Sequence, residues 1–190
     1  MIEKSFVSMF SKDAMPSYSI VENMLKSGVN VDEETQNGQT PLLRAAVYSD
    51  DSKILKLLLE YGANVNVRDN IGRTPLMAAV IGNKIDNVRL LLEYGAKVNS
   101  FILETKETPI ILGCMWADKK VIELLVAHNA NINAQNKNGY NALMVAIECG
   151  KYDIVEFLLE QGVVLTKEIK QFAKTFPKFV ASEIGKKLLS

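Results

Sequence analysis

Few side chains in this sequence carry the groups that enzymes and metal sites use. His128 is the single histidine, Cys114 and Cys149 are the two cysteines, and Asp50 and Asp51 form the one adjacent pair of aspartates. One histidine and two separated cysteines cannot supply an ordinary zinc site. The sequence has no His-Glu-x-x-His motif, no glycine-rich phosphate loop and no Gly-x-Ser-x-Gly motif. We therefore expect no enzyme activity, no metal site and no cofactor.

Protein binding is the other chemistry that the sequence offers. Protein interfaces are enriched in tryptophan, tyrosine, methionine and arginine. The chain has a single tryptophan, Trp116, together with six tyrosines and seven methionines. The predicted helices and turns decide which of these side chains are free to meet a partner.

The sequence repeats a four-residue motif at intervals of 34, 34 and 33 residues. The four copies are Thr40-Pro41-Leu42-Leu43, Thr74-Pro75-Leu76-Met77, Thr108-Pro109-Ile110-Ile111 and Asn141-Ala142-Leu143-Met144. A second series follows apolar runs in step with the first, at Gly28, Gly62, Gly95, Asn129 and Gly162. Two series in phase indicate structural repeats of one size.

Each repeated residue has a physical role in a pair of helices. Thr40, Thr74 and Thr108 can cap the first helix, and the proline that follows suits the first helical position. The second helix buries an apolar stripe against its neighbours. Glycines such as Gly62 end this helix in the left-handed conformation, and Asn129 can do the same. An extended turn then leads into the next pair.

The period, the Thr-Pro-Leu motif and the small pairs Ala45-Ala46 and Ala78-Ala79 resemble the ankyrin repeat, a turn followed by two helices. The resemblance implies an all-α fold, an ankyrin-type α-solenoid of stacked helix-turn-helix repeats joined by β-hairpin-like turns. It also implies a single domain over residues 1–190. We expect an N-terminal cap at 1–34, repeats at 35–68, 69–101, 102–135 and 136–168, and a C-terminal cap at 169–190 in which Pro177 separates two short helices.

The whole chain has no charge that would attract nucleic acid or an anionic membrane, since 22 basic residues balance 22 acidic ones. Residues 163–190 are basic, with six lysines against two glutamates and hence a net charge of +4. We interpret them as a solvated cap, with an electrostatic docking patch as the alternative. The uncharged run from Thr108 to Ala117 is far shorter than the roughly 18 residues of a membrane span. We expect neither nucleic acid nor membrane as a partner.

The cysteines and the first residues indicate the compartment. Cys114 and Cys149 fall on the first helices of adjacent repeats, two register positions apart. Packed helices lie about 8 to 10 Å apart, beyond the roughly 7 Å that a disulfide spans between Cα atoms, so we predict free thiols. Residues 5–10 are too short and polar for a signal peptide. Both observations favour the cytoplasm.

The resemblance also implies where a partner binds. In ankyrin repeats the partner usually lies on the concave face, the surface formed by the turn tips and the exposed side of each first helix. Several residues at these positions are aromatic or apolar where a merely solvated face would be polar, and Arg73 adds a charge-assisted donor. The candidates are Tyr48, Ile71, Arg73, Ile81, Ile102, Leu103, Met115, Trp116 and Tyr140. For Trp116 and Met115 the alternative is packing between neighbouring first helices.

The third repeat departs from the pattern. It has one residue more before Thr108 than the second repeat has before Thr74, and Lys106 replaces the turn glycine. The extra stretch begins with the apolar residues 101–103, which either fold back on the stack or await a partner. Gly113 replaces an alanine inside a helix at a cost of about 1 kcal/mol. A requirement for small size, such as a position beneath Trp116, would explain it.

The sequence therefore predicts a monomeric protein-interaction module that binds a peptide segment or a folded partner on its concave face. A microbial scaffold, effector or inhibitor would fit such a short chain. The alternative is a structural or regulatory subunit of a larger assembly. In that case the C-terminal cap would join the assembly through an exposed end formed by Phe172, Phe176 and Phe179.

Overall fold

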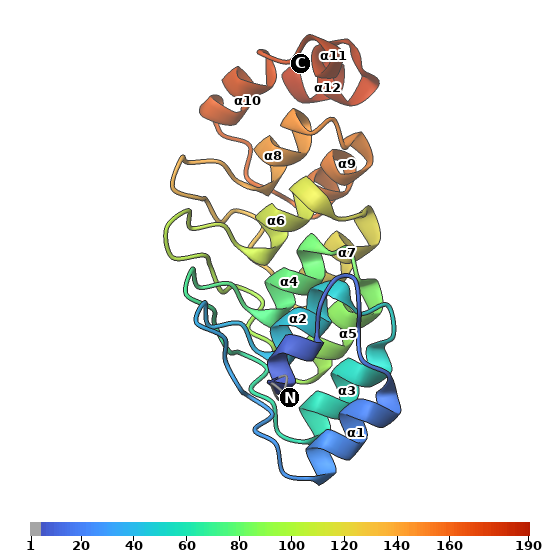
Figure 1. The fold of residues 1–190 in the computed structure, drawn as a ribbon. Coiled ribbons are helices and arrows are strands. Elements are labelled where there is room, and N and C mark those ends of the chain that lie inside the picture. Colours follow the sequence, from blue (N-terminus) through green and yellow to red (C-terminus); the bar gives the residue numbers. More distant parts are fainter. Residues whose placement is uncertain (1–4) are drawn as a thin grey trace.

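Stacked pairs of short helices make up the computed structural model, which describes residues 5–190 and has no strand within them (Figure 1). The all-α solenoid prediction is confirmed. The four repeats contain α2 (Pro41–Tyr48) and α3 (Ser52–Glu60), α4 (Pro75–Ile81) and α5 (Ile85–Glu93), α6 (Pro109–Trp116) and α7 (Lys119–Ala127), and α8 (Ala142–Glu148) and α9 (Tyr152–Glu160). Residues 1–4 of the expected N-terminal cap lie outside the described residues.

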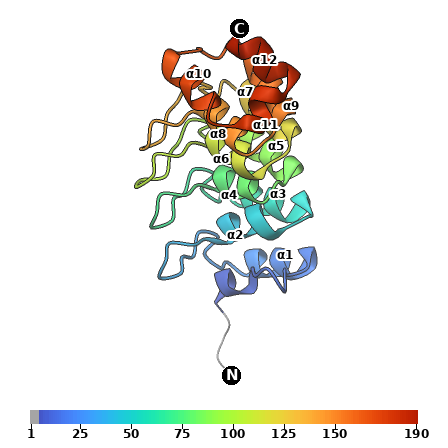
Figure 2. The same ribbon diagram turned by 90° about the horizontal axis from the view of Figure 1, so that it is seen from above.

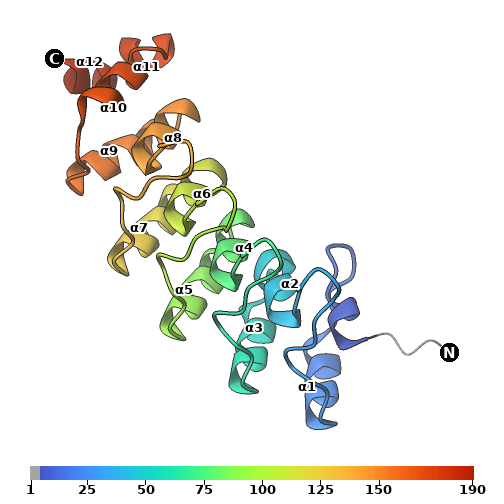
Figure 3. The same cartoon turned by 90° about the vertical axis from the view of Figure 1, so that its left-hand side faces the viewer.

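The helices form two parallel rows. The inner row runs α2, α4, α6, α8, and each inner helix packs on the next. The outer row begins with α1 (Tyr18–Lys26) and continues through α3, α5, α7 and α9. The turns project from the inner row on the side away from the outer helices (Figure 2). The two ends of the described chain lie at opposite ends of the stack (Figure 3).

The capping prediction is confirmed for two of the three threonines, and Asn141, which was not predicted, caps the fourth inner helix in the same way. The side chains of Thr40, Thr74 and Asn141 each accept a hydrogen bond from the backbone N–H three residues later, at 3.3, 3.4 and 3.0 Å. The prediction is wrong for Thr108, whose Oγ1 is buried and has no hydrogen-bond partner among the described residues. The turn before Thr108 is the one with an extra residue.

The outer helices end as predicted. Gly62 and Gly95 have φ of +87° and +83°, and Asn129 adopts the same left-handed conformation with φ of +65°. Asparagine tolerates this region better than other residues with a Cβ. Between the rows, Leu42, Leu76 and Leu143 occupy equivalent and fully buried sites.

A side-chain link joins each repeat to the next behind the turns. Asn66 Oδ1 accepts the N–H of Lys97 at 2.8 Å. Asn99 makes the same bond to Asn131 at 2.8 Å, and Asn133 makes it to Val164 at 2.9 Å. The side-chain amides of Asn66 and Asn99 also donate to carbonyls at the end of the following outer helix. Consecutive units are therefore held at one fixed offset.

Both ends of the stack are irregular. At the N-terminus a 3-10 turn (Phe6–Met9) packs with α2, and Phe10 is fully buried there. At the C-terminus lie α10 (Lys167–Ala173), α11 (Pro177–Ala181) and α12 (Glu183–Leu189). Pro177 separates α10 from α11 as expected, and the third helix was not expected. We propose to begin this cap at Thr166, whose side chain caps α10, because a boundary between 168 and 169 would cut that helix.

Candidate protein-binding surface

The turn tips form a continuous row because each one donates a backbone hydrogen bond to the tip before it. Asn70 N–H donates to the Asn37 carbonyl at 3.2 Å and Leu103 N–H to the Ile71 carbonyl at 3.1 Å. The fourth turn donates in the same way, to the carbonyl of Thr105, at 2.8 Å. The concave face therefore has one edge whose backbone positions are mutually fixed.

A polar side chain at the start of the turn organises three of the four turns. In the second turn, Asp69 Oδ1 accepts the N–H of Ile71 at 3.2 Å and that of Arg73 at 2.8 Å. Thr35 and Asn136 occupy the same register position in the first and fourth turns, where Thr35 accepts one backbone N–H of its own turn and Asn136 accepts two. These turns are narrow hairpins whose tips carry polar residues with few exceptions.

The third turn is held by a buried apolar side chain instead of a polar one. Ile102 takes the register position of Asp69 and is only 9% exposed, so its assignment as a free binding residue is wrong. An apolar side chain cannot accept the turn's N–H groups, and the longer loop closes through a bond from Lys106 N–H to the Ile102 carbonyl at 2.9 Å. Lys106 has φ of +60°, in the place where the other turns have glycine. Of the two alternatives for residues 101–103, Ile102 folds back while Phe101 and Leu103 stay exposed.

Two exposed apolar residues, Ile71 and Leu103, are joined by a backbone hydrogen bond at the middle of the tip row. Ile71 is 54% exposed and Leu103 is 55% exposed. Leu103 Cγ lies 2.7 Å from the point where a Cβ on Gly72 would stand, so Leu103 rests directly on that glycine. The structure thus places two of the predicted residues, from different repeats, next to each other.

Arg73 is not a free hydrogen-bond donor. Its Nε and Nη2 lie 3.0 Å each from Asp69 Oδ2, and Asp69 also accepts from the side chain of Gln39 at 2.7 Å. The carboxylate of Asp69 is buried. The guanidinium is therefore held in place by a shielded carboxylate and keeps only part of its donor capacity for a partner.

Two exposed aromatic side chains lie at the C-terminal ends of inner helices, away from the turn tips. Tyr48 and Trp116 end α2 and α6 and are 39% and 62% exposed. Between them, at the same register position, is Gly82, where a Cβ would lie 2.7 Å from the Val47 carbonyl oxygen. The helix between the two aromatic residues therefore cannot carry a side chain there. Sequence reasoning did not identify this close approach of α2 and α4, although a glycine at this register position was a visible signal.

The remaining inner-helix candidates, Ile81 and Met115, are half-buried and pack against the core. For Met115 the packing alternative therefore accounts for part of the side chain. Trp116 is different, because most of its surface is free. The residue at position 113 must be small because α7 packs against it, and not because Trp116 covers it. A Cβ on Gly113 would lie 2.6 Å from Cδ1 of Ile122 on α7.

Tyr140 belongs to the joint between the last repeat and the C-terminal cap. Its ring lies 5.1 Å from that of Phe172, which in turn lies 4.9 Å from Phe176. Phe179 is fully buried and packs near Tyr152 at 5.7 Å. The expectation of an exposed end made of phenylalanines is therefore wrong, because Phe179 is fully buried and Phe172 and Phe176 are half-buried against the core.

One residue of the third repeat was missing from the predicted set. Phe101 is exposed, and two cations lie over its ring: Lys106 Nζ at 4.2 Å and Arg68 Cζ at 5.9 Å from the ring centre. Arg68 also donates to the Phe101 carbonyl at 3.0 Å. The signal in the sequence was a phenylalanine at the register position of Arg68, next to the remodelled turn.

The side chains with catalytic potential lie apart from one another. The ring of His128 is 3.0 Å from the Leu124 carbonyl at the end of α7, Asp51 caps α3, and Asp50 pairs with Lys84. Both cysteines are free, as predicted. Burial raises the pKa of Cys114 to about 12, and it also raises the pKa of the exposed Cys149. Over residues 5–190 there is no group of three or more histidine, cysteine, aspartate or glutamate side chains placed to hold a metal ion.

None of the helices between residues 5 and 190 has the length and apolar character needed to cross a membrane.

Comparison with known proteins identifies the fold family. A family model described as ankyrin repeats (3 copies) matches residues 12–102 and 100–169. An ankyrin repeat protein of Fowlpox virus (strain NVSL) is 31% identical over 121 residues, which are 64% of this chain and 28% of that protein. Neurogenic locus notch homolog protein 1 of Danio rerio is 32% identical over 166 residues, 87% of this chain and 7% of that protein.

Rabankyrin-5 of Mus musculus is 28% identical over 160 residues, 83% of this chain and 14% of its own length. The chain therefore spans less than a third of each of these relatives. The matched segments coincide with the stacked helix pairs and their hairpin turns. The chain belongs to the ankyrin-repeat family, whose repeats are generally protein–protein interaction modules and are typically non-catalytic.

Proposed function

We propose that this chain binds another protein on its concave face, with Trp116 and Tyr48 as anchors at the inner helices and Ile71 with Leu103 at the turn tips. The observation that carries the proposal is the exposure of Trp116. A tryptophan that is 62% exposed leaves a large apolar surface in water, and buried tryptophan and tyrosine dominate the energy of protein interfaces.

The backbone around these side chains favours tight binding because it is already ordered. The turn tips are linked by backbone hydrogen bonds, and the loops between inner and outer helices are linked by side chains. Asn83 and Asp118 exchange two hydrogen bonds of 2.7 and 3.0 Å, and Lys151 Nζ donates to the Ala117 carbonyl at 2.8 Å. A partner that docks on this face meets little cost for ordering the backbone.

The other predicted residues receive supporting roles in this proposal. Ile102 holds the third turn so that Leu103 faces outward, Tyr140 anchors the cap, and Arg73 offers its remaining N–H groups to a partner carbonyl or carboxylate. Ile81 and Met115 form the apolar floor between the two aromatic anchors. At Gly82 the backbone of α2 packs closely, so no side chain of α4 stands between the two aromatic anchors.

The wider setting is also part of the proposal. A monomeric cytoplasmic module with a protein partner, and with neither nucleic acid nor membrane as its target, agrees with the balanced charge and the free cysteines. A scaffold, an effector and an inhibitor would all use the same face. The alternative of a subunit joined through its cap loses its main support, because Phe179 is buried.

The test compares three baits made from the whole chain: the native protein, Trp116→Ala and Lys56→Ala. Lys56 is exposed on the outer helix α3 and serves as the control. A partner from the native source, identified by quantitative mass spectrometry, should be retained by the native protein and by Lys56→Ala and lost with Trp116→Ala. Calorimetry with that partner should show a loss of about 2 kcal/mol or more for Trp116→Ala and for Tyr48→Ala.

Two results would contradict the proposal. Equal affinity of all the variants would place the binding site away from the concave face. Unfolding of Trp116→Ala, seen as a large fall in its melting temperature, would show that Trp116 is part of the core. Circular dichroism of each variant before the binding experiment separates the two results.

A further inference from the structure

A pocket of about 360 Å³, the turn pocket, lies between the third turn and the segment that leads into the fourth turn. The volume falls within the range of pockets that hold small ligands or single side chains. Most of the lining is polar, and none of the four proposed anchors on the concave face belongs to it. The lining residues are Asn99, Phe101, Lys106 and Thr108 around the third turn, and Asn131, Ala134 and Gln135 before the fourth turn.

The turn pocket follows from the replacement of an arginine by a phenylalanine. In the second repeat, Arg68 Nη1 donates to the Gly72 carbonyl at 3.3 Å and to the Phe101 carbonyl at 3.0 Å, so its side chain bridges the second and third turns. Phe101 stands at the same register position in the third repeat and has no side-chain donor for such a bridge. The space between the third and fourth turns therefore stays open.

One wall of the turn pocket carries a hydroxyl that lacks a partner. Thr108 is only 6% exposed, and its Oγ1 makes no hydrogen bond within residues 5–190. A buried polar group without a partner is uncommon and calls for an explanation, such as a bound ion or water. A ligand oxygen, or a water that the ligand holds, would give this hydroxyl its partner.

Among the described residues, Lys106 is the only charged one that lines the turn pocket. Its Nζ lies 4.2 Å from the centre of the Phe101 ring, a cation–π contact that holds the ammonium group in place. No carboxylate within residues 5–190 forms an ion pair with it. Lys106 also has φ of +60° where the other turns have glycine, so the chain keeps a lysine at a position that its backbone disfavours. The turn pocket therefore carries an ordered positive charge that no neighbouring carboxylate balances.

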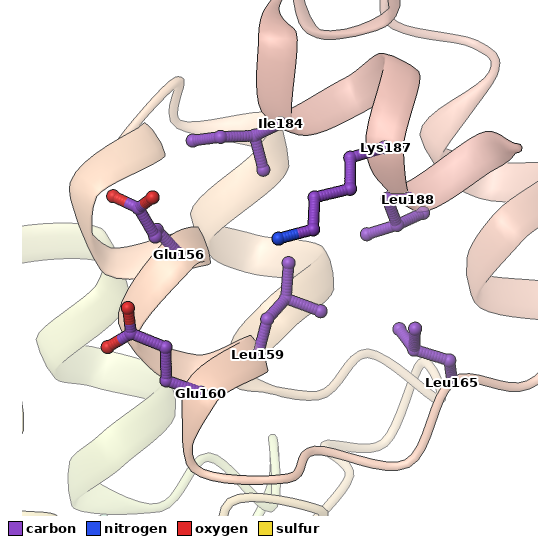
Figure 4. A pocket seen from close by; sticks show the side chains of 7 residues that line it. All are labelled: Glu156, Leu159, Glu160, Leu165, Ile184, Lys187 and Leu188. Carbon is purple, nitrogen blue, oxygen red and sulfur yellow. The ribbon is translucent and has the colours of Figure 1, made fainter.

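The pocket of the same volume between α9 and α12 differs in charge (Figure 4). Its lysine, Lys187, shares the lining with the carboxylates of Glu156 and Glu160, and apolar side chains make up the rest. Two carboxylates beside one ammonium group leave no demand for an anion from outside. Of these two pockets, the turn pocket is the one whose charge attracts an anion.

We propose that the turn pocket binds a carboxylate carried on a short aliphatic chain, as in a glutamate side chain. The carboxylate pairs with Lys106 Nζ and accepts N–H groups from the side-chain amides of Asn131 and Gln135, while the methylene groups lie against Phe101 and Ala134. One ammonium group balances one negative charge, whereas a phosphate group carries about two. The carboxylate belongs either to an acidic residue of a protein partner or to a free organic acid, and the experiment separates these two sources.

The test follows the side-chain amide signals of Asn131 and Gln135 by nuclear magnetic resonance while the whole isotope-labelled chain is titrated with two probes. One probe is the peptide Gly-Gly-Glu-Gly-Gly with blocked ends, and the other is butyrate, which has the same carboxylate and aliphatic chain without a peptide. Both should shift these signals, and the matched peptide with glutamine should not. Tighter binding of the glutamate peptide assigns the site to a protein partner, and equal or tighter binding of butyrate assigns it to a free acid.

Substitutions of lysine test the source of the charge. Lys106→Met keeps the length of the side chain and removes its charge, so it should weaken binding of the glutamate peptide about fivefold, as expected for one exposed ion pair. Lys106→Arg keeps the charge and should retain most of the binding. Lys137→Met, at an exposed lysine of the fourth turn that does not line the pocket, should bind as the native protein does. Trp116→Ala should also bind normally, which separates this inference from the concave-face proposal.

The hydroxyl is tested by Thr108→Val with Thr74→Val as its matched control. Thr74 Oγ1 caps its helix at 3.4 Å, so Thr74→Val should lower the melting temperature. Thr108→Val has no such bond to lose and should leave the melting temperature unchanged. Binding of the glutamate peptide should weaken in Thr108→Val only, and equal affinity of both variants would overturn the role given to the hydroxyl.

Three further outcomes would overturn the inference as a whole. Equal shifts with the glutamate and glutamine peptides would show that the pocket does not recognise a carboxylate. An unchanged affinity of Lys106→Met would place the probe elsewhere on the surface. Inorganic phosphate that displaces the glutamate peptide more strongly than butyrate does would assign the pocket to another class of anion.

Discussion

The second and third repeats fold into the same helix pair from different turn chemistry. The second turn is held by the buried carboxylate of Asp69, which accepts backbone and side-chain hydrogen bonds. The third turn is held by the burial of Ile102 and is one residue longer. Both turns place the following proline at the start of an inner helix, so the position of that helix does not depend on how the turn is held.

The difference appears at the surface. In the second repeat, the register position at the end of the inner helix holds Gly82, and a side chain there would strike the neighbouring backbone. In the third repeat the same position holds Trp116, which is largely free. The third repeat also exposes Phe101 and Leu103 around its remodelled turn. The irregular third repeat thus supplies two of the four proposed anchors, Trp116 and Leu103, and Phe101 beside them.

The largest effect should come from the core that the two repeats share. Leu91 and Leu125 occupy the same position on α5 and α7, and both are fully buried. We expect Leu91→Ala and Leu125→Ala each to lower the free energy of unfolding by about 2 to 5 kcal/mol. Urea unfolding followed by circular dichroism measures both values. A small loss for Leu125→Ala alone would show that the third repeat is less tightly packed than the second.

The turns should differ in what they lose on mutation. Asp69→Ala leaves backbone and side-chain donors without their acceptor, so we expect a loss of about 1 to 3 kcal/mol. Asp69→Asn keeps one oxygen acceptor and should lose less. In the third turn, Ile102→Val should cost about 0.5 to 1.5 kcal/mol through packing alone. Similar losses for Asp69→Asn and Asp69→Ala in urea unfolding would contradict the acceptor role of the Asp69 carboxylate.

The pH dependence of stability should differ because Cys114 stands where the second repeat has Val80. The pKa of Cys114 is raised by burial from 9.0 to about 12, so the folded state holds the thiol proton more tightly than the unfolded state. The stabilising contribution is complete below about pH 9 and is lost as the pH rises toward 12. We expect this thiol to lower stability by about 1.4 kcal/mol per pH unit in that window.

The control for this pH effect is Cys114→Ala, which removes the titrating group. Above pH 9 its stability should fall less steeply than that of the native protein, with lysine and tyrosine titration common to both. Parallel pH profiles in urea unfolding would show that the Cys114 thiol is not shielded.

The smallest effect concerns the helix interior, where Gly113 replaces Ala79. In Gly113→Ala the new Cβ would press on Ile122 Cδ1, and overpacking outweighs the gain in helix preference. We expect a net loss of about 1 kcal/mol, the balance of these two terms. In an Ile122→Val background, which removes the Cδ1 atom, the same change should stabilise. Thermal unfolding of the four proteins measures the coupling, and additive effects would contradict the contact.

The sequence predicted the repeats well because each one is fixed by short-range chemistry. Threonine caps, prolines at the first helical position and left-handed glycines act within a few residues, and Asn129 could be placed by the same rule. The binding candidates were harder, since exposure depends on contacts between repeats. Register placed Trp116 and Tyr48 on the free side of their helices. It could not show that Ile102 folds inward, or that the cap covers Tyr140.

The C-terminal region escaped prediction for a related reason. After Gly162 the sequence has no turn motif. The repeat period therefore gave no sign of the three helices of the C-terminal cap, or of the pocket that Leu159 and Leu188 line between α9 and α12. Arg73 illustrates the same limit. Its type suggested a donor for a partner, and only the structure shows the buried Asp69 that occupies it. Contacts between residues of one short turn are visible in a sequence only when the motif is already known.

The asparagine links between repeats have a consequence for how such a chain can grow. Asn66, Asn99 and Asn133 each make the same bond to the next unit, and the last of them joins the third repeat to the fourth. Every junction therefore presents one interchangeable connector. If a repeat-length segment is duplicated or lost, each remaining unit still has the asparagine bond to its neighbour. The stack can therefore become longer or shorter while both terminal caps stay the same.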